Sequence, residues 1–427
     1  MSEWKSYKLN ELADIIMGQS PPSSSYNEDN LGLPFLQGCA DFGDTFPIAK
    51  YFCTEPKKTA PLNSVLISVR APVGLTNLAN KSFVIGRGLA AIIPTKSELK
   101  FLFYLINHNV SKLNVVSQGS TFSAINSDDL NNFELEAPLI TEQRLIAQIL
   151  STIDSVIEKT QSAIDKYKAI KQGMLQDLFT RGIDIKTGKL RPRYEDAPEL
   201  YKESKLGWIP NEWNEGNFID FADEKISHSF TGGPFGSDLQ TKHYTATGVR
   251  IIQLQNIGDG VFNDEYKIYT SEEKANQLSN CNIFPGEIIL SKMADPIARA
   301  CIIPDTESRF LMASDGIRLA IDKKKYNSRF VLETINHKRF RNIAELKSTG
   351  STRSRIGLAE LKIIPIVYPI KDEQDLIGLK LDTIVSKTIS EEKYLSKLIR
   401  IKSGLMSDLL SGKKRVKVDS EDLTTAS

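Results

Sequence analysis

The sequence lacks several features that would have assigned it to a common class. No apolar run approaches the 18 residues that suggest a membrane-spanning helix. The first residues, Met-Ser-Glu-Trp, do not resemble a secretory signal peptide. The 4 cysteines are dispersed without a Cys-x-x-Cys pair, and the 4 histidines are equally scattered. We therefore expect a cytoplasmic protein with reduced thiols, no membrane segment and no metal site.

Motifs of catalysis and nucleotide binding are also missing. There is no Gly-x-x-x-x-Gly-Lys phosphate loop, no Gly-x-Gly-x-x-Gly after a predicted strand and no His-Glu-x-x-His. The Asn-Pro-Pro-aromatic motif of amino-methyltransferases is absent as well. We therefore expect a protein that is not itself an enzyme.

Composition is that of an ordinary globular protein. The chain has 427 residues, of which 41% are hydrophobic and 25% are charged, and its net charge is +1. This length is too great for one core and fits two or three domains. The net charge by itself points to no class of partner.

Part of the sequence occurs twice. Residues 119–180 align with residues 350–411 without a gap, and the identities continue through a helical pattern. A gapless match keeps every residue on the same helix face, so it indicates an internal duplication. Identical pairs include Gly119/Gly350, Thr121/Thr352, Ile125/Ile356, Pro138/Pro369, Glu142/Glu373, Gln143/Gln374, Ile146/Ile377, Leu150/Leu381, Gly173/Gly404 and Asp177/Asp408.

Each copy predicts one long helix. Pro138 and Thr141 precede the first, and Pro369 and Asp372 precede the second. Each helix spans about 39 residues, or about 58 Å. The predicted apolar seams are Ile146, Ile149, Ile153, Val156, Ala163, Tyr167, Ile170 and Met174, and Ile377, Leu381, Ile384, Leu395, Leu398, Ile401, Leu405 and Leu409. Such a narrow seam needs a partner helix, and the other copy fits that role. A helix lying on a globular core is the alternative.

The repeat organises the whole chain. We expect an α+β protein with two globular mixed domains separated by two long antiparallel helices, a coiled coil related by a pseudo-two-fold axis. The predicted parts are a first domain (1–138), a first helix (139–182), a linker (183–207), a second domain (208–370), a second helix (371–412) and a basic tail (413–427) that frays. A parallel helix pair is disfavoured, because the linker would have to be nearly fully extended.

Each globular domain contains a basic stretch although the chain is nearly neutral. Residues 57–97 include no acidic residue, and residues 323–344 include only Glu333. Lysine and arginine release counterions from DNA, so two such stretches favour phosphate binding over ordinary solvated surface.

Several side chains are candidates for DNA contact. Two Gly-Ser-Thr loops precede the long helices and suit phosphate or guanine contact, although a structural turn explains their glycines equally well. The side-chain amides of Gln37 and Gln253 suit hydrogen bonding to the edge of adenine. The alternative is that both are strand residues that face solvent. Arginines follow or flank comparable strands in both domains. The full candidate set is Gln37, Arg70, Arg87, Gln118, Ser120, Thr121, Gln253, Lys292, Arg299, Arg318, Ser351, Thr352, Arg353 and Arg355.

The connector and the helix ends carry a family resemblance. Its most specific segments are Gly182–Asp184, Lys189–Arg191, Pro198–Ser204, Gly207–Pro210, Lys171–Leu178, Lys402–Leu409 and Pro138–Gln143, with Gly32–Gly38, Ser68–Gly74 and Gly233–Ser237 in the globular domains. Together with the two long helices, they resemble the specificity subunit of type I restriction-modification systems over nearly the whole chain. The segment Pro369–Gln374 departs only mildly from the family pattern.

The resemblance implies a non-catalytic subunit. Each domain would read one half of a split, asymmetric target in double-stranded DNA, and the helices would set the gap and dock two modification (methyltransferase) subunits. The full complex would add ATP-dependent restriction subunits. S-adenosylmethionine, ATP and Mg would then be bound by those partners and none by this chain. Domains of this family read different DNA sequences. A base contact made by one domain therefore cannot be assigned to the residue at the same position here.

Two other functions stay open at the level of sequence. A stand-alone bivalent DNA-binding regulator would bind DNA tightly without a partner. A coiled-coil scaffold would bind only proteins, and charge reversal at Arg70, Arg87, Arg353 and Arg355 would leave its activity unchanged.

Overall fold

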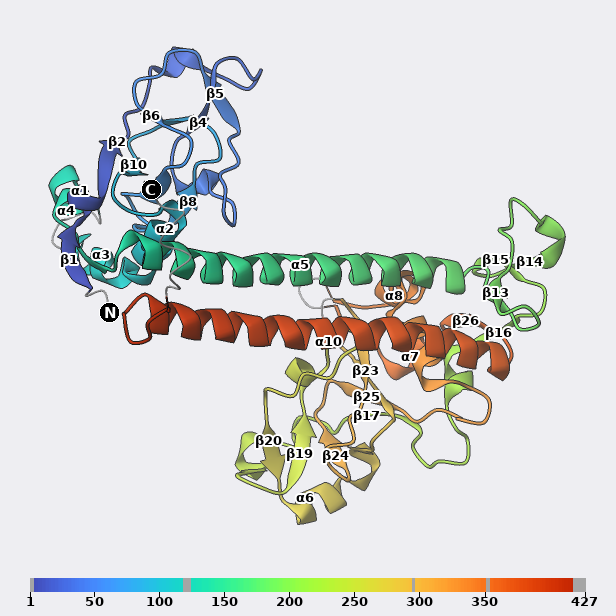
Figure 1. The fold of residues 1–427 in the computed structure, drawn as a ribbon. Helices are drawn as coiled ribbons and strands as arrows, with labels where there is room; N and C mark the ends of the chain where they lie inside the picture. The colour runs from blue at the N-terminus through green and yellow to red at the C-terminus, as the bar shows by residue number, and fades with distance from the viewer. Residues whose placement is uncertain (1–3, 118–123, 294–295, 351–353, 418–427) are drawn as a thin grey trace. The chain divides into compact units, whose positions relative to one another are not determined.

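The computed structural model describes residues 4–117, 124–293, 296–350 and 354–417. Its chain forms two compact units, the first made of residues 1–163 and 391–427 and the second of residues 164–390. The two long helices, α5 (Ile140–Leu178) and α10 (Lys371–Leu409), are each divided between the units (Figure 1). Each unit therefore contains the first part of one long helix and the last part of the other.

The first unit is built on two sheets, one antiparallel and one mixed. One has the strand order β2 (Ala13–Met17), β10 (Leu89–Pro94), β7 (Val65–Ser68) and β8 (Thr76–Leu78). The other has the order β3 (Tyr26–Asn27), β5 (Tyr51–Cys53), β4 (Leu33–Leu36), β9 (Phe83–Ile85) and β6 (Thr59–Ala60). In the second sheet β4 and β9 are parallel. Strand β7 is buried along its whole length, as expected of a run of β-branched and aliphatic residues inside a sheet.

The second unit repeats this topology. Its four-stranded sheet has the order β17 (Phe230–Gly232), β25 (Gly316–Leu319), β22 (Ile288–Ser291) and β23 (Ala300–Ile302). Its five-stranded sheet has the order β18 (Tyr244–Thr245), β20 (Ile268–Thr270), β19 (Val249–Ile252), β24 (Phe310–Met312) and β21 (Asn282–Ile283). Strands β19 and β24 are parallel, as β4 and β9 are. The duplication therefore extends through both globular parts.

Short strand pairs and helices complete the units. The pairs are β1 (Lys5–Lys8) with β11 (Glu134–Ala137), β16 (Asn214–Asn217) with β26 (Pro365–Tyr368), and, in the connector, β12 (Ile183–Asp184) with β13 (Lys189–Leu190) and β14 (Tyr201–Ser204) with β15 (Gly207–Pro210). The shorter helices are α1 (Leu9–Leu12), α2 (Leu99–His108), α3 (Val110–Ser117), α4 (Ser127–Asn131), α6 (Glu272–Gln277), α7 (Ser328–Asn336), α8 (Lys338–Leu346) and α9 (Leu358–Lys362). No helix of the described residues is long and apolar enough to cross a membrane.

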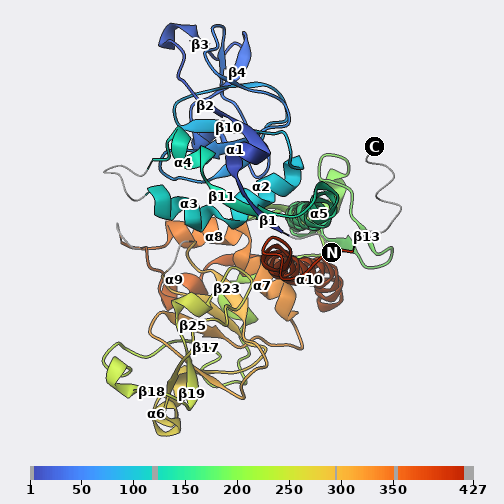
Figure 2. The same ribbon diagram turned by 60° about the vertical axis from the view of Figure 1, so that its left-hand side comes forward.

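The two long helices run antiparallel within each unit. In the first unit Lys402 of α10 pairs with Asp154 of α5 at 2.7 Å, and Leu409 shares a core with Ile146. Higher numbers on α10 thus meet lower numbers on α5. In the second unit Leu178 and Ile377 lie in one core. Figures 1 and 2 both show the helices side by side, and the predicted antiparallel arrangement is confirmed.

Two details of the predicted local structure are wrong. Ile170 and Ile401, expected in the apolar seam, are 40% and 41% exposed, whereas Ile164 and Leu175, outside the predicted seam, are buried. The spacing of residues 9–16 predicts a short helix, but the helix ends at Leu12 and strand β2 follows. Short apolar runs do not separate helix from strand, and pairing with β10 decides here.

A buried glutamate near the start of each long helix accepts hydrogen bonds from an arginine outside that helix. In the first unit Arg415 donates from Nε and Nη2 to Glu142 at 2.9 and 3.0 Å. In the second unit Arg191 donates from Nη1 and Nη2 to Glu373 at 2.6 and 2.8 Å. The backbone of Ile183 and the indole of Trp213 also donate to Glu373, at 2.8 and 3.2 Å. Each pair fastens the segment that follows one long helix to the start of the other.

The start of the C-terminal tail is held by these contacts. The sequence predicts that the tail frays after Gly412, whereas Arg415 is bound to Glu142 and Lys414 pairs with Asp408 at 3.0 Å. Residues 418–427 lie outside the described residues.

The variant Glu373→Ala tests the buried pair. It removes the main partner of Arg191, whose side chain is 8% exposed, and we expect a loss of about 3–5 kcal/mol in the free energy of unfolding. The matched control is Asp382→Ala, which removes an ion pair of equal length, 2.6 Å, from the surface and should cost about 1 kcal/mol or less. Guanidinium unfolding midpoints compare the two, and equal midpoints would contradict this account.

Candidate nucleic-acid interface

The two sheets of each unit meet at a short turn with the same hydrogen-bond pattern. In the first unit Gly86 N donates to Leu36 O at 2.8 Å and Leu89 N donates to Gly86 O at 3.0 Å. In the second, Ala313 N donates to Ile252 O at 2.9 Å and Gly316 N donates to Ala313 O at 3.1 Å. The turn at residues 86–88 therefore corresponds to the turn at residues 313–315.

A second set of bonds extends this correspondence to the chain beside the turn. In the first unit Val69 N donates to Gly88 O, and Ile125 N donates to Val69 O, both at 2.9 Å. In the second unit Lys292 N donates to Asp315 O at 2.7 Å, and Ile356 N donates to Lys292 O at 3.0 Å. The isolated bridge between Arg70 and Ala124 then matches the bridge between Met293 and Arg355.

One glycine in each unit allows the two sheets to approach this closely at the turn, and we call this close approach the sheet crossing. A Cβ atom on Gly18 would lie 2.2 Å from Gly86 O, and one on Gly233 would lie 1.8 Å from Ala313 O. Both distances are far below contact distance. Only glycine therefore fits at these two positions without moving the turn.

In the first unit the turn gathers three of the candidate side chains. Gly88 contacts the backbone on both sides, since its carbonyl accepts from Val69 N and its Cβ position lies 3.1 Å from Gln37 O. Gln37, Arg70 and Arg87 are thus neighbours around Gly88, and all three are exposed. The structure brings together one glutamine and two arginines that the sequence proposed separately.

In the second unit the same place is a hollow of about 230 Å³. Its lining includes Pro234, Phe235, Tyr244, Gln253 and residues 313–316. Phe235 is 81% exposed. The side-chain amide of Gln253 donates to the hydroxyl of Tyr244 at 3.1 Å, which orients it. The corresponding Tyr26 instead donates to Pro21 O at 2.9 Å, so Gln37 is not held in that way.

Charged side chains surround this hollow. Arg355 donates to Asp315 Oδ1 at 2.6 Å, and Lys292 donates to Ser314 O at 3.0 Å. Burial lowers the pKa of Lys292, Asp315 opposes that shift and Arg355 adds to it. Lys292 is half-buried against the turn, whereas the Arg355 side chain is 57% exposed. Arg355 is therefore the cation of this group that a ligand can reach.

The comparison with family models identifies this repeated architecture. The model of the type I restriction modification DNA specificity domain matches residues 1–166 and 253–400. The chain belongs to this family.

Individual relatives agree with the family model. The putative type I restriction enzyme MjaX specificity subunit of Methanocaldococcus jannaschii is 37% identical over 204 residues, which cover 43% of this chain and about half, 48%, of that protein. The EcoDI specificity subunit of Escherichia coli is 21% identical over 96% of this chain and 87% of its own length. The crystal structure of a type I restriction-modification system S subunit from M. genitalium has a TM-score of 0.61 at 15% identity and covers 98% of this chain and 97% of that one. This chain therefore shares the fold of that structure.

One predicted contact residue is buried and has a structural role. Arg318 is 5% exposed and donates from Nε and Nη2 to Glu287 at 2.8 and 2.6 Å, so it is not available for DNA contact. Arg299 is partly buried and donates to Leu254 O at 2.9 Å in the loop that follows Gln253. Arg299 stays a predicted contact.

Two arginines of the second basic stretch pair with carboxylates distant in sequence. Arg329 pairs with Asp382 and Arg341 pairs with Asp259, both at 2.6 Å. A count of charges along the chain does not include such partners. The expectation of a free basic surface at residues 323–344 is therefore wrong for these two arginines.

Some candidates lie outside the described residues, and others were missed. Gln118, Ser120, Thr121, Ser351, Thr352 and Arg353 fall in the first group. The sequence prediction missed Asp315 and Tyr244. The sequence does contain a signal for Tyr244, because it precedes Gln253 at a spacing similar to that of Tyr26 before Gln37. Asp315 had none, because its position in the first unit is Gly88.

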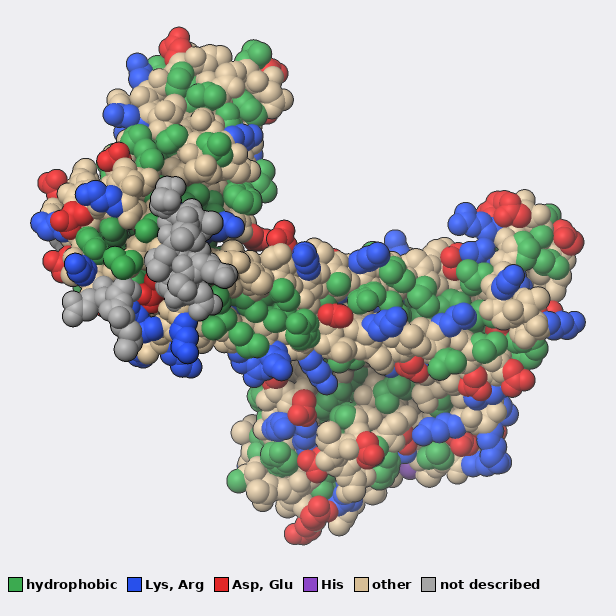
Figure 3. Space-filling view, in the orientation of Figure 1, with side chains coloured by type: hydrophobic (Ala, Val, Ile, Leu, Met, Phe, Trp, Pro, Cys, Tyr) green, Lys and Arg blue, Asp and Glu red, His purple; other side chains and the backbone are tan. Residues whose placement is uncertain are grey.

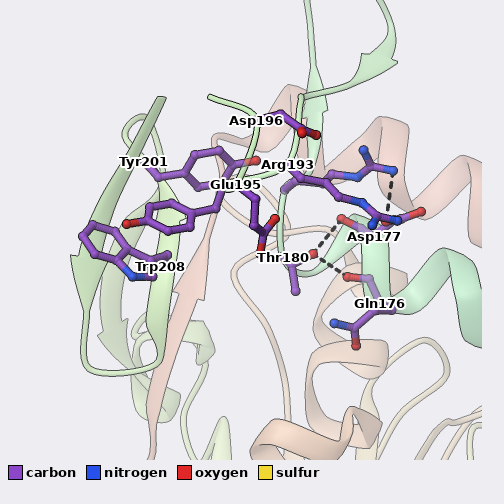
Figure 4. A pocket seen from close by; sticks show the side chains of 10 residues that line it. Gln176, Asp177, Thr180, Arg193, Glu195, Asp196, Tyr201 and Trp208 are labelled. Carbon is purple, nitrogen blue, oxygen red and sulfur yellow. Dashed lines mark hydrogen bonds and ion pairs between the residues drawn. The ribbon is translucent and has the colours of Figure 1, made fainter. Parts of the chain in front are cut away.

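A larger hollow of the second unit lies between the end of α5 and the connector. It has a volume of about 560 Å³, and Figure 4 shows its charged side chains and its aromatic wall. Tyr194 stacks on Trp208 with ring centroids 4.5 Å apart, and Trp208 is 45% exposed. Among the described residues no group of metal-ligating side chains occurs here or elsewhere.

Replacing Gly233 tests the sheet crossing. We expect Gly233→Ala to lower the free energy of unfolding by about 1–3 kcal/mol, because the new methyl group must displace the Ala313 carbonyl. Gly236→Ala is the control, since a Cβ there meets no atom within 4 Å. Denaturant unfolding of both variants checks this, and an unaffected Gly233→Ala protein would refute the proposed steric constraint.

Proposed function

We propose that this chain is the DNA-recognition subunit of a type I restriction-modification complex, in which each unit reads one half of a split target. The observation that carries the proposal is the repeated sheet crossing, which presents a different set of polar side chains in each unit. A common backbone with variable side chains is the arrangement expected of a reader of base edges.

The different side chains favour an asymmetric target. Where the first unit has Arg70 and Arg87, the second has Met293 and Ser314 at the corresponding positions. Where the second unit has Asp315 and Arg355, the first has Gly88 and Ala124. Because the side chains at matched positions differ in charge and in hydrogen-bonding capacity, the two half-sites should differ in sequence.

Particular contacts follow from side-chain chemistry. Gln37 and Gln253 suit the N6 and N7 atoms of adenine, and Arg70, Arg87 and Arg355 suit guanine or phosphate. The loop residues Gln118, Ser120, Thr121, Ser351, Thr352 and Arg353 remain proposed phosphate or base contacts.

We also propose that two modification subunits dock on the long helices. Both helices expose large apolar side chains (Figure 3), which is unusual for helix faces that meet only water. They are Ile170, Leu379 and Ile389 in the second unit and Tyr394, Ile399 and Ile401 in the first. S-adenosylmethionine, ATP and Mg would be bound by the modification and restriction subunits of the complex, which would act on cytoplasmic DNA.

Two alternatives make different predictions. A stand-alone regulator would bind a split site with full affinity without a modification subunit. A scaffold that binds only proteins would keep its activity when residues around Gly88 are substituted. The exposed aromatic side chains of the connector support this alternative. Both are distinguished from the proposal by the next two experiments.

The double variant Arg70→Ala/Arg87→Ala tests DNA contact by the first unit. If both arginines bind phosphates, the log–log slope of affinity against salt should fall in magnitude by about 2. Gel-shift titrations of the complex with modification subunits, at several salt concentrations, provide the measurement. Lys100→Ala removes an exposed cation outside the turn and is the control. A scaffold would show an unchanged slope in both proteins.

The variant Leu379→Lys tests docking on the helices. Leu379 is 66% exposed on α10, so a lysine there should not unfold the chain but would place a charge in an apolar contact. We expect co-purification of the modification subunit to fall about tenfold or more. Val261→Lys, at a position 51% exposed on the globular part, should keep full co-purification. If the modification subunit co-purifies with Leu379→Lys as well as with the unsubstituted chain, α10 is not part of the docking surface at this position.

A further inference from the structure

An acidic side chain lies within the proposed interface of the second unit. Asp315 belongs to the turn at residues 313–315, lines the 230 Å³ hollow and is 20% exposed. Its Oδ1 accepts a hydrogen bond from Arg355 at 2.6 Å. The matched positions of the first unit are Gly88 and Ala124, so this ion pair belongs to the second unit alone.

A carboxylate at this place needs an explanation. DNA phosphates repel it, and its presence weakens binding unless it makes a favourable contact in the complex. The N–H donors that the major groove offers are the amino groups of cytosine and adenine, N4 and N6. A carboxylate that faces DNA is therefore suited to a base edge and not to the backbone.

The arginine beside it has the complementary preference. The guanidinium fork of Arg355 matches the O6 and N7 acceptors of guanine, which one arginine can bind with two hydrogen bonds. Guanine and cytosine lie opposite each other in a single base pair. An arginine and an aspartate in contact thus match both bases of one G·C pair.

The backbone around both residues is fixed. Arg355 exchanges two hydrogen bonds with Thr349, at 2.8 and 2.9 Å, and Asp315 O accepts from Lys292 N at 2.7 Å. Lys292 Nζ is occupied by Ser314 O at 3.0 Å and secures the same turn. The two side chains are therefore presented from a supported position, as selective recognition requires.

We propose that Asp315 and Arg355 together read one G·C base pair in the half-site of the second unit, where Arg355 donates to guanine O6 and N7 and Asp315 accepts from cytosine N4. The ion pair of the free protein opens only slightly when the two side chains turn to the two bases. The inference rests on the proposed DNA-recognition function and names the chemistry of one of its two sites.

The test is Asp315→Ala in the complete modification complex, with N6-methyladenine mapped across a host genome, because alanine removes the acceptor oxygens that asparagine would keep. The wild-type motif should contain a G·C pair in one half-site that the variant no longer requires. The preference at that position should fall roughly 5- to 150-fold, the range for a specific base contact, and the other half-site should be unchanged. Arg355→Lys keeps the charge but removes the fork, so it should relax the same position. Arg355→Lys also provides the test if Asp315→Ala fails to fold.

The control is Asp382→Ala, which removes the Arg329–Asp382 pair of the same 2.6 Å length and should keep the full motif. The proposal is overturned if Asp315→Ala or Arg355→Lys keeps the wild-type motif, or if Arg355→Lys weakens methylation equally at all sequences. It is also overturned if neither half-site contains a required G·C pair. If the wild-type complex directs no motif at all, the DNA-recognition function itself has failed, and that result is distinct from the others.

Discussion

A buried carboxylate near the start of each long helix is the interaction on which the architecture depends. Glu142 and Glu373 are 2% and 1% exposed, and each accepts two hydrogen bonds from an arginine that follows the opposite helix. An unpaired charge at either place would be costly, so the antiparallel helix ends are held in one register. The indole of Trp213 also donates to Glu373 and so ties the start of α10 to the globular part of the second unit.

The sheet crossing adds a steric constraint to this electrostatic one. Gly18 and Gly233 allow two sheets to approach within hydrogen-bond distance of one turn, and that turn carries the variable side chains. The backbone is therefore kept while the chemistry at the turn changes from two exposed arginines to an ion pair and an oriented glutamine. Such a division between a constant frame and variable contacts would let one duplicated fold recognise two different sequences, as the proposed function requires.

Much of this was predictable from the repeat, because a gapless match through a helical pattern constrains faces, lengths and direction together. The exposure of Gln37, Arg70 and Arg87 was also predictable, since residues just after buried strands are exposed at turns, and their contact with DNA stays a prediction. Partners distant in sequence were not predictable: Arg318 is neutralised by Glu287, and Arg329 by Asp382. The exposed Ile170 shows the same limit, because a seam that curves across a long helix depends on what packs against it.

The most direct measurement is a genome-wide map of N6-methyladenine in an unmethylated host that expresses the modification subunit with and without this chain. The account predicts one split motif that appears only with the chain and has two different half-sites. Methylation that is independent of the chain, or a motif with two identical half-sites, would contradict it.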